Sequence, residues 1–392
     1  MQIEQIKVNN FKSLVDFEID LRKFTCLIGL NGAGKSTVLQ FIDFLGQQVR
    51  GNMKGWLDER QWKSSDLTSR LTADDKIDFE VSIVASTGER GAHWKATYDP
   101  NKNQCIRESI TTPGAELQVA EGQLLVVDLI KTPRTPVSFQ QVPFSYEGSI
   151  LSQLTDEWLP ESLLGFKNYF STINSLDLLS PELLRQRTRQ SDGTLGIGGQ
   201  NLSSFVFEMS DEKRLAVIRK LKQVYPQLEG LIARPVQSGW KQLEIAETYM
   251  GRESGFWPQM NTEARHINDG MLRIIAILAA LSSETRFLLF DEIENGVNPE
   301  IVSFVLNALV TASQQIVVTT HSPMILNYIE DDVARNGILY LYKTRSGKTH
   351  SIPFFSIPSL AEKLTVMGPG EAFVDTNLIE LADEIEAITK GV

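Results

Sequence analysis

The sequence predicts an α/β fold in which helices flank a mainly parallel sheet, with an N-terminal antiparallel β element and a long β-then-helical insertion. Three observations support this prediction. A glycine-rich loop at residues 29–36 lies between an apolar run and a helical pattern, the strand–loop–helix arrangement of a phosphate-binding loop. Residues 77–128 contain several short runs typical of antiparallel strands. From residue 268 onward helical and apolar strand patterns alternate, which favours a parallel sheet covered by helices.

The first part of the chain, residues 1–130, is predicted to be the N-terminal part of the core with a β-rich lobe. Residues 2–9 and 14–21 alternate apolar and polar side chains, so they predict two antiparallel strands. A buried strand at residues 24–28 leads into the glycine-rich loop, and a helix at residues 37–48 leaves it. Further strands are expected at residues 77–85, 92–98, 105–111 and 124–129.

Residues 131–250 are predicted to be a mostly helical insertion. The period becomes helical from residue 149 to residue 231, and residues 238–250 predict a strand. Residues 251–392 are expected to complete the core. Here we expect helices at 268–281 and 299–312 and strands at 287–290 and 315–319. The simplest interpretation is one α/β core that this insertion interrupts.

The composition of the 392 residues is that of an ordinary globular protein, with 42% hydrophobic and 22% charged residues. A net charge of −11 does not steer the whole chain to nucleic acid, although a local basic patch at Arg185, Arg187 and Arg189 could still bind it. A solvated surface is the alternative for that patch. With no apolar run long enough for a membrane span, no signal peptide pattern and only two cysteines, we expect a cytoplasmic protein without a membrane role.

The loop Gly29-Leu30-Asn31-Gly32-Ala33-Gly34-Lys35-Ser36 fits the pattern G-x-x-x-x-G-K-[ST]. Its glycines let backbone N–H groups surround phosphates, Lys35 reaches the β- and γ-phosphates, and Ser36 holds Mg²⁺. A chance match is expected on the order of once in 100 chains of this length, and the flanking strand and helix lower that further. The predicted nucleotide-binding residues of this loop are Asn31, Gly32, Gly34, Lys35, Ser36 and Thr37.

Two later strands end in polar residues suited to nucleotide chemistry. The apolar run at 287–290 ends in Asp291 and Glu292, and we expect Asp291 near Mg²⁺ and Glu292 on the attacking water. The run at 315–319 is followed by His321, which can contact the γ-phosphate. The alternatives are an acidic surface turn for the carboxylates and a structural role for the histidine.

A third feature is the helix opening at residues 267–273, where Gly270 lets a backbone come close. The first-turn N–H groups of a helix can receive an anion. The phosphate loop already provides a binding site for one nucleotide. We therefore expect the start of this helix to bind the nucleotide of a second subunit. An ordinary capped helix with packed apolar residues is the alternative, and both can hold together.

Four features taken together resemble the ABC-type ATPases of the SMC/RecF/OLD group. They are the phosphate loop, the helix of Asp269-Gly270-Met271-Leu272-Arg273, the strand ending in Asp291-Glu292, and the segment Thr320-His321-Ser322-Pro323. More narrowly, the chain resembles the compact branch of predicted ATPases in bacterial DNA repair and anti-phage defence. The segment Asn9-Asn10-Phe11-Lys12-Ser13 is similar to its N-x-F-[KR]-S motif, and Glu294-Asn295-Gly296-Val297-Asn298-Pro299 to its E-N-G-x-x-P motif.

The resemblance implies ATP and Mg²⁺ as ligands, with Lys12 and Ser13 lining the nucleotide pocket and Ser36, Asp291 and Gln153 near the metal. It also implies that Glu292 and His321 are catalytic. Asn268 and Gly270 would contact the ATP of a partner subunit. This chain has Asn268 and Met271 where the usual motif has Ser and Thr.

For function, the resemblance implies an ATP-binding and ATP-hydrolysing switch that forms a homodimer or higher homo-oligomer through ATP-sandwiched heads. It would gate DNA engagement or an effector, a nuclease or toxin, in anti-phage defence or DNA repair. About 70 residues follow His321, so we expect any effector to be a separate chain. The alternatives are the ATPase subunit of an ABC membrane transporter and an ATP-binding scaffold with little turnover.

Overall fold

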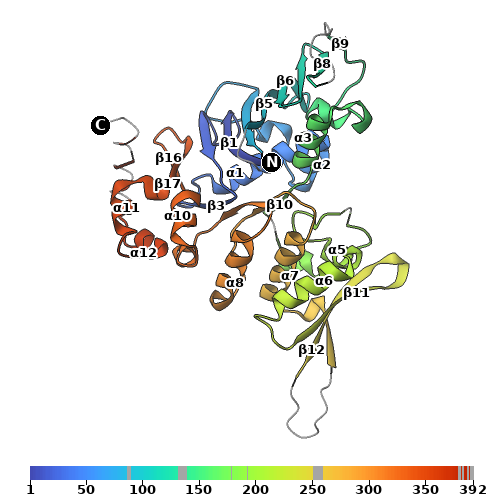
Figure 1. The fold of residues 1–392 in the computed structure, drawn as a ribbon, viewed down its shortest axis with the longest axis vertical. Helices are drawn as coiled ribbons and strands as arrows, with labels where there is room; N and C mark the ends of the chain where they lie inside the picture. The colour runs from blue at the N-terminus through green and yellow to red at the C-terminus, as the bar shows by residue number, and fades with distance from the viewer. Residues whose placement is uncertain are drawn as a thin grey trace. The chain divides into compact units, whose positions relative to one another are not determined.

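The structure is a computed structural model of the chain (Figure 1). It describes residues 1–85, 90–130, 139–177, 179–191, 193–249, 259–377, 381, 384, 385 and 388. These residues fall into two compact units. The first contains Met1–Ile173, Asp331–Met367 and Asp375–Val392, and the second contains Asn174–Glu330 and Gly368–Val374.

The first unit contains an antiparallel sheet of eight described strands in the order β2-β1-β4-β5-β6-β7-β8-β9 (Figure 1). The strands expected from the sequence in this lobe are confirmed, whereas β7 was not predicted. In β1 the side chains of Ile6 and Val8 are buried, because alternate residues of a strand point to one face, and Ile3 is buried as well, beyond a register irregularity between Ile3 and Gln5. The bounds are β1 Gln2–Asn9, β2 Phe17–Asp20, β4 Ile77–Val84, β5 Arg90–Asp99, β6 Gln104–Thr112, β7 Ala115–Ala120, β8 Gln123–Asp128 and β9 Gln140–Gln141.

Helix α1 (Lys35–Arg50) follows the phosphate loop and packs by aromatic side chains against this sheet. The ring of Phe44 lies 5.0 Å from that of Tyr98 on β5, and the ring of Phe41 lies 6.0 Å from that of Phe79 on β4. Asp43 is buried on the same helix and accepts hydrogen bonds from Trp56 and Arg60, at 2.6 and 2.8 Å. The helix that carries the loop is therefore fixed by both apolar and polar contacts.

The buried strand β3 (Phe24–Ile28) pairs in parallel with β16 (Ile338–Lys343), and β16 pairs antiparallel with β17 (Thr349–Pro353). The strand expected at residues 24–28 is confirmed, and every residue of it is buried. The other helices of this unit are α2 Met53–Glu59, α3 Glu161–Ser171, α10 Asp331–Gly337, α11 Pro358–Lys363 and the 3₁₀ turns Ser64–Asp66, Ile150–Ser152, Asp156–Trp158 and Phe354–Ser356.

In the second unit, β14 (Phe287–Phe290) and β15 (Gln315–Thr319) pair in parallel. Helix α7 (Asp269–Leu281) precedes β14, and α8 (Pro299–Val310) connects β14 to β15. This strand–helix–strand order confirms the parallel arrangement and the four elements expected here. The unit also contains β10 Ile173–Leu176, α4 Pro181–Leu184, α5 Leu202–Glu208, α6 Asp211–Leu221, α9 Pro323–Leu326, α12 Pro369–Val374 and the 3₁₀ turns Gln237–Gly239 and Ala264–His266.

A second sheet of this unit has the order β11-β12-β13, with bounds Leu228–Pro235, Lys241–Thr248 and Gln259–Glu263. The strand expected at residues 238–250 is confirmed as β12. The helical interpretation of residues 149–231 is wrong for β10 and for the start of β11. Residues Leu228 and Leu231 are buried by pairing with β12, and such long-range pairing overrides a local helical period.

The division into residues 1–130, 131–250 and 251–392 remains a prediction. None of the helices in the described ranges is both long enough and apolar enough to cross a membrane.

Candidate functional site

The phosphate loop lies at the start of α1 and contains three glycines with left-handed backbone. Their φ values are 143° at Gly29, 77° at Gly32 and 108° at Gly34. A Cβ at position 29 would lie 2.2 Å from the carbonyl oxygen of Leu341, so only glycine fits there. Gly34 caps α1 without any side-chain hydrogen bond. The N-terminus of the helix thus has the geometry of an anion-binding site.

The ammonium group of Lys35 lies over this loop. Its Nζ donates hydrogen bonds to the carbonyl oxygens of Gly29 at 2.8 Å and Leu30 at 3.2 Å. The Lys35 residue is only 4% exposed, which keeps its positive charge within the turn where phosphates are expected. This position agrees with the role that the motif implies for Lys35.

Thr349, at the start of β17, connects the loop to Ser13 and was not predicted as a site residue. Its hydroxyl lies 2.8 Å from Oγ of Ser13 and 3.0 Å from the carbonyl oxygen of Ala33, and its amide donates to the carbonyl of Ser13. Thr349 is completely buried. Because it lies more than 300 residues from the loop in sequence, no local pattern could have indicated it.

The segment that carries Lys12 and Ser13 is a tight turn after β1. Lys12 has a left-handed backbone with φ of 49°, and its Nζ donates to Gln40 of α1 at 2.9 Å. The same ammonium lies 3.2 Å from the ring centroid of Trp62. Lys12 therefore lies beside the helix that carries the phosphate loop, as the resemblance implies.

The placement of Gln153 counts against its predicted role at the metal. It is exposed, and its Nε2 is 3.5 Å from Oγ of the neighbouring Ser152. A Cβ on Gly51, which ends α1, would lie 2.7 Å from Ser152. Ser36 lies at the other end of α1, about 22 Å away at 1.5 Å per residue. The resemblance implies a glutamine at the edge of the insertion beside the metal, whereas the structure places Gln153 next to Ser152, near the end of α1 that is away from Ser36.

The second unit holds the two carboxylates at the end of β14. The hydroxyl of Thr319 on β15 donates a hydrogen bond to Oδ1 of Asp291 and accepts one from the amide of Glu292 at 2.8 Å. Glu292 has a left-handed backbone with φ of 47°, which is strained for a residue with a Cβ. Its carboxylate is about half exposed. The backbone there is strained, and strain of this kind is concentrated at functional sites.

His321 lies close to Glu292, as its predicted role requires. Its Nε2 is 3.6 Å from Oε1 of Glu292. Its amide donates to Oε1 of Glu294 at 2.7 Å, and Asn295 donates from Nδ2 to Oε2 of Glu292 at 3.3 Å. The loop that follows Glu292 therefore holds the histidine and the carboxylate at the same place.

The start of α7 packs against this loop. The side-chain oxygen of Asn268 accepts a hydrogen bond from the amide of Met271 at 2.8 Å, so Asn268 is the N-cap of the helix. Asparagine caps a helix about as well as serine. A Cβ on Gly270 would lie 2.7 Å from the carbonyl oxygen of Gly296. The substitution of Asn for the usual Ser therefore leaves the capped helix start intact.

The residues expected to bind a magnesium nucleotide fall into two groups. The phosphate loop, Lys12 and Ser13 lie in the first unit, and the carboxylates, the histidine and the helix start lie in the second. The hydroxyl of Ser36 and the carboxylate of Asp291 are hard oxygen ligands of the type that Mg²⁺ prefers. In the loop itself, a Cβ at Gly29 would meet the carbonyl oxygen of Leu341 and a Cβ at Gly34 would meet the side chain of Thr349, whereas a Cβ at Gly32 would meet nothing within 4 Å.

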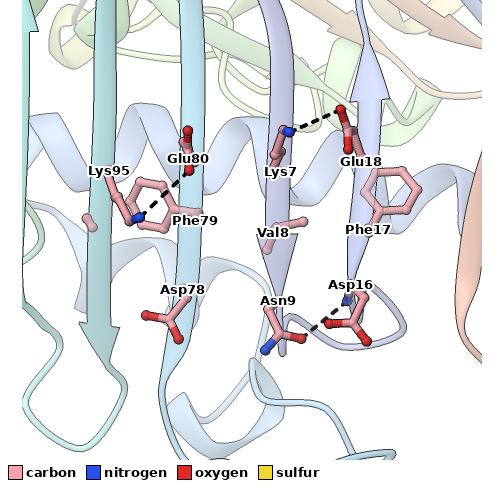
Figure 2. A pocket seen from close by; sticks show the side chains of 11 residues that line it. Lys7, Val8, Asn9, Asp16, Phe17, Glu18, Asp78, Phe79, Glu80 and Lys95 are labelled. Carbon is pink, nitrogen blue, oxygen red and sulfur yellow. Dashed lines mark hydrogen bonds and ion pairs between the residues drawn. The ribbon is translucent and has the colours of Figure 1, made fainter.

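A separate pocket of about 410 Å³ lies on the outer face of the first sheet (Figure 2). Charged side chains from β2, β1, β4 and β5 line it, with Lys7 paired to Glu18 at 3.3 Å and Lys95 to Glu80 at 3.9 Å. These pairs are largely exposed, and such surface pairs contribute little stability. The pocket contains none of the predicted site residues.

Two family models match the ends of the chain. Residues 1–108 match a family described as AAA ATPase domain. Residues 259–327 match a family described as AAA domain, putative AbiEii toxin, Type IV TA system. The two matches enclose the phosphate loop on one side and the helix start, the carboxylates and His321 on the other. Both matches agree with the resemblance to ABC-type ATPases of the SMC/RecF/OLD-like group that the motifs indicate. No curated protein matches the sequence of this chain.

Solved structures similar to this chain include heads of SMC proteins. The SMC head domain from Thermotoga maritima shares 11% sequence identity, with a TM-score of 0.46, over 90% of this chain and 99% of that one. The Smc head domain with a coiled coil and joint from Pyrococcus yayanosii shares 12% identity, with a TM-score of 0.49, over 90% and 97%. That from Pyrococcus furiosus, bound to the C-terminal domain of ScpA, shares 13% identity, with a TM-score of 0.46, over 93% and 99%.

Proposed function

We propose that this ATPase is a dimerising switch that binds and hydrolyses ATP and thereby gates a separate effector or the engagement of DNA. One observation carries the proposal. The helix start with Asn268 and Gly270, the carboxylate of Glu292 and His321 converge on the loop at residues 293–299 in one unit. Separate sequence motifs predicted these segments, and their convergence is what a hydrolytic site at a subunit seam requires.

In the proposed reaction, Ser36 and Asp291 are the residues that would hold Mg²⁺, which would supply positive charge to neutralise the charge developing on the transferred phosphoryl group. Lys35 binds the β- and γ-phosphates, and the glycines of the loop admit them. Glu292 orients the attacking water and accepts its proton through a carboxylate that is half exposed. His321, 3.6 Å from that carboxylate, senses the γ-phosphate. We propose that the residues of the phosphate loop and those around Glu292 act on the same triphosphate, and this rests on the order of the motifs along the chain.

The helix start of α7 supports the dimer. The side-chain oxygen of Asn268 accepts a hydrogen bond from the amide of Met271. The side-chain nitrogen of Asn268 is therefore the donor that we propose for a phosphate. We propose that this donor and the backbone of Gly270 contact the ATP of a second copy. Closure of the dimer is then favoured by ATP and opposed by hydrolysis, which is a population shift between two states.

The partner is proposed from the family resemblance. By that resemblance, the proposed partner is a nuclease or toxin encoded as a separate chain and controlled by head closure in the cytoplasm during anti-phage defence or DNA repair. Nucleic acid remains a second candidate ligand of the closed dimer.

Molar mass in solution tests the switch. The Glu292→Gln variant with Mg²⁺ and ATP should elute as a dimer, because it binds ATP without hydrolysing it, and as a monomer without nucleotide. The Gly270→Trp variant in the same background is the matched control and should stay monomeric, since a large side chain would meet the carbonyl of Gly296 and block the helix start. An unchanged mass with and without ATP would refute the dimerising switch.

A further inference from the structure

Arg273, the last residue of the motif Asp269-Gly270-Met271-Leu272-Arg273, is a buried cation. It lies in the second turn of α7, is 8% exposed and is surrounded along the helix by apolar residues. Desolvation by burial lowers the pKa of its guanidinium group, while the charges of Glu292, Glu294 and Asp291 act in the opposite direction. A buried charge costs several kcal/mol unless it is well paired, so its partners indicate its role.

The partners of Arg273 are backbone carbonyl groups. Its Nη2 donates hydrogen bonds to the carbonyl oxygen of Asp291 at 3.0 Å and to that of Glu292 at 2.9 Å. Both bonds are made to the main chain of these two residues and not to their carboxylate groups. The guanidinium thus ties α7 to the end of β14 through the main chain of the two carboxylate residues.

This tie acts on a strained residue. The left-handed backbone of Glu292 costs about 1–2 kcal/mol for a residue with a Cβ, and it persists only where neighbouring bonds hold it. Thr319 holds the amide of Glu292 at 2.8 Å, and Arg273 holds its carbonyl at 2.9 Å. Removing either bond frees one side of the residue and lets the carboxylate leave its position.

The burial of Arg273 is not optimised for stability. Its Nε is buried and makes no hydrogen bond within the described part of the chain, which costs free energy. An apolar side chain of similar length would avoid that cost. Such a cost is expected where a residue contributes to function.

We propose that Arg273 is a positioning residue for hydrolysis, which holds the backbone of Asp291 and Glu292 and ties it to the helix that begins at Asn268 and Gly270. When a second nucleotide binds at the start of α7, the effect of that binding is then transmitted through one continuous helix to the position of the catalytic carboxylate. The inference rests on the proposed hydrolysis and adds a residue through which the partner's nucleotide controls it.

The test compares Arg273→Met, Arg273→Lys, Glu292→Gln and the double variant Arg273→Met/Glu292→Gln. Methionine keeps an unbranched side chain that reaches about as far as Nε of the arginine, but it removes the charge and both hydrogen bonds. We expect Arg273→Met to lower kcat at least about tenfold with KM within about threefold, and Arg273→Lys to recover part of the loss. In the Glu292→Gln background, Arg273→Met should change the residual rate less than about twofold, because it acts through Glu292.

Ser282→Ala is the matched control on the same helix, since it removes a hydrogen bond to Leu278 at the far end of α7, and its kcat should equal that of the wild type. If Arg273→Met does not fold, Arg273→Gln gives the same comparison. A kcat within twofold of wild type, or an equal loss in the Glu292→Gln background, would overturn the inference. A wild-type protein without turnover would instead contradict the proposed function.

Discussion

The amide of Glu292 donates a hydrogen bond of 2.8 Å to the hydroxyl oxygen of Thr319, on the neighbouring parallel strand. The same hydroxyl donates to the carboxylate of Asp291. One completely buried side chain therefore aligns both carboxylate residues at the ends of adjacent strands. This relationship makes Thr319 a positioning residue that can be tested apart from the catalytic groups.

Replacing Thr319 by Val should lower ATP turnover about tenfold while nucleotide affinity stays within about threefold. Valine keeps the shape but removes the hydroxyl, so the amide of Glu292 and the carboxylate of Asp291 lose a shared partner. The measurement is steady-state hydrolysis together with direct nucleotide binding. Thr319→Ser keeps the hydroxyl and should retain most of the activity, and equal losses in the two variants would contradict the positioning role.

Thr349 should support nucleotide binding through the phosphate loop. Thr349→Val removes the hydroxyl bonds to Ser13 and to Ala33, and we expect a loss of about 1–3 kcal/mol in the free energy of unfolding. Affinity for ATP should fall about tenfold, because the loop loses its contact with the segment of Lys12 and Ser13. Chemical denaturation and nucleotide titration measure both effects. Thr349→Ser is the control, and an unchanged affinity in Thr349→Val would refute the connection.

Two glycines of the loop should differ in their tolerance of alanine. At Gly29 a Cβ would meet the carbonyl oxygen of Leu341 at 2.2 Å, whereas at Gly32 it would meet nothing within 4 Å. Gly32→Ala should therefore cost only the backbone strain of a positive φ, about 1 kcal/mol. Gly29→Ala should cost about 3 kcal/mol or more. Thermal unfolding compares the variants, and equal losses would mean that the contact with β16 does not constrain the loop.

Glu108 should make stability depend on pH. It is 3% exposed and accepts hydrogen bonds from Trp94 at 2.9 Å and from the amide of Ile150 at 3.0 Å. Burial raises its pKa from 4.5 to about 7. Between these values the unfolded chain has lost this proton and the folded chain has kept it, so the free energy of unfolding falls as pH rises from about 4.5 to about 7 and is level above that.

The size of this effect is on the order of 3 kcal/mol, from 1.36 kcal/mol per pKa unit. Chemical denaturation at several pH values between 4 and 8 measures it. Glu108→Gln removes the titrating group and should flatten that part of the profile. A variant that keeps the full slope would show that other groups cause it.

Much of the core could be predicted from the sequence because its signals are local. The run at residues 24–28 is mostly apolar and is followed by the glycine-rich loop, and the runs at 287–290 and 315–319 are followed by polar residues of clear chemical use. Each of these strands has the bounds that the pattern predicts. A buried parallel strand is rich in apolar residues, so it stands out from the polar and glycine-rich segments around it.

The residues that connect these segments could not be predicted in the same way. Thr349 and Thr319 act through hydrogen bonds to positions far away or on another strand, and single threonines carry no periodic signal. Gln153 was misplaced because the path of the insertion depends on how its segments pack. Arg273 did have a signal, since a lone charge in an apolar helical run requires a buried partner.

Turnover of ATP by the wild type and by Glu292→Gln, measured with Mg²⁺ under conditions where both proteins bind ATP, tests the central claim most directly. We predict steady release of phosphate by the wild type and a rate at least about 100-fold lower in Glu292→Gln, with nucleotide affinity retained and with Lys35→Ala failing to bind. A wild type that releases no phosphate, or a Glu292→Gln variant that hydrolyses ATP as fast as the wild type, would contradict it.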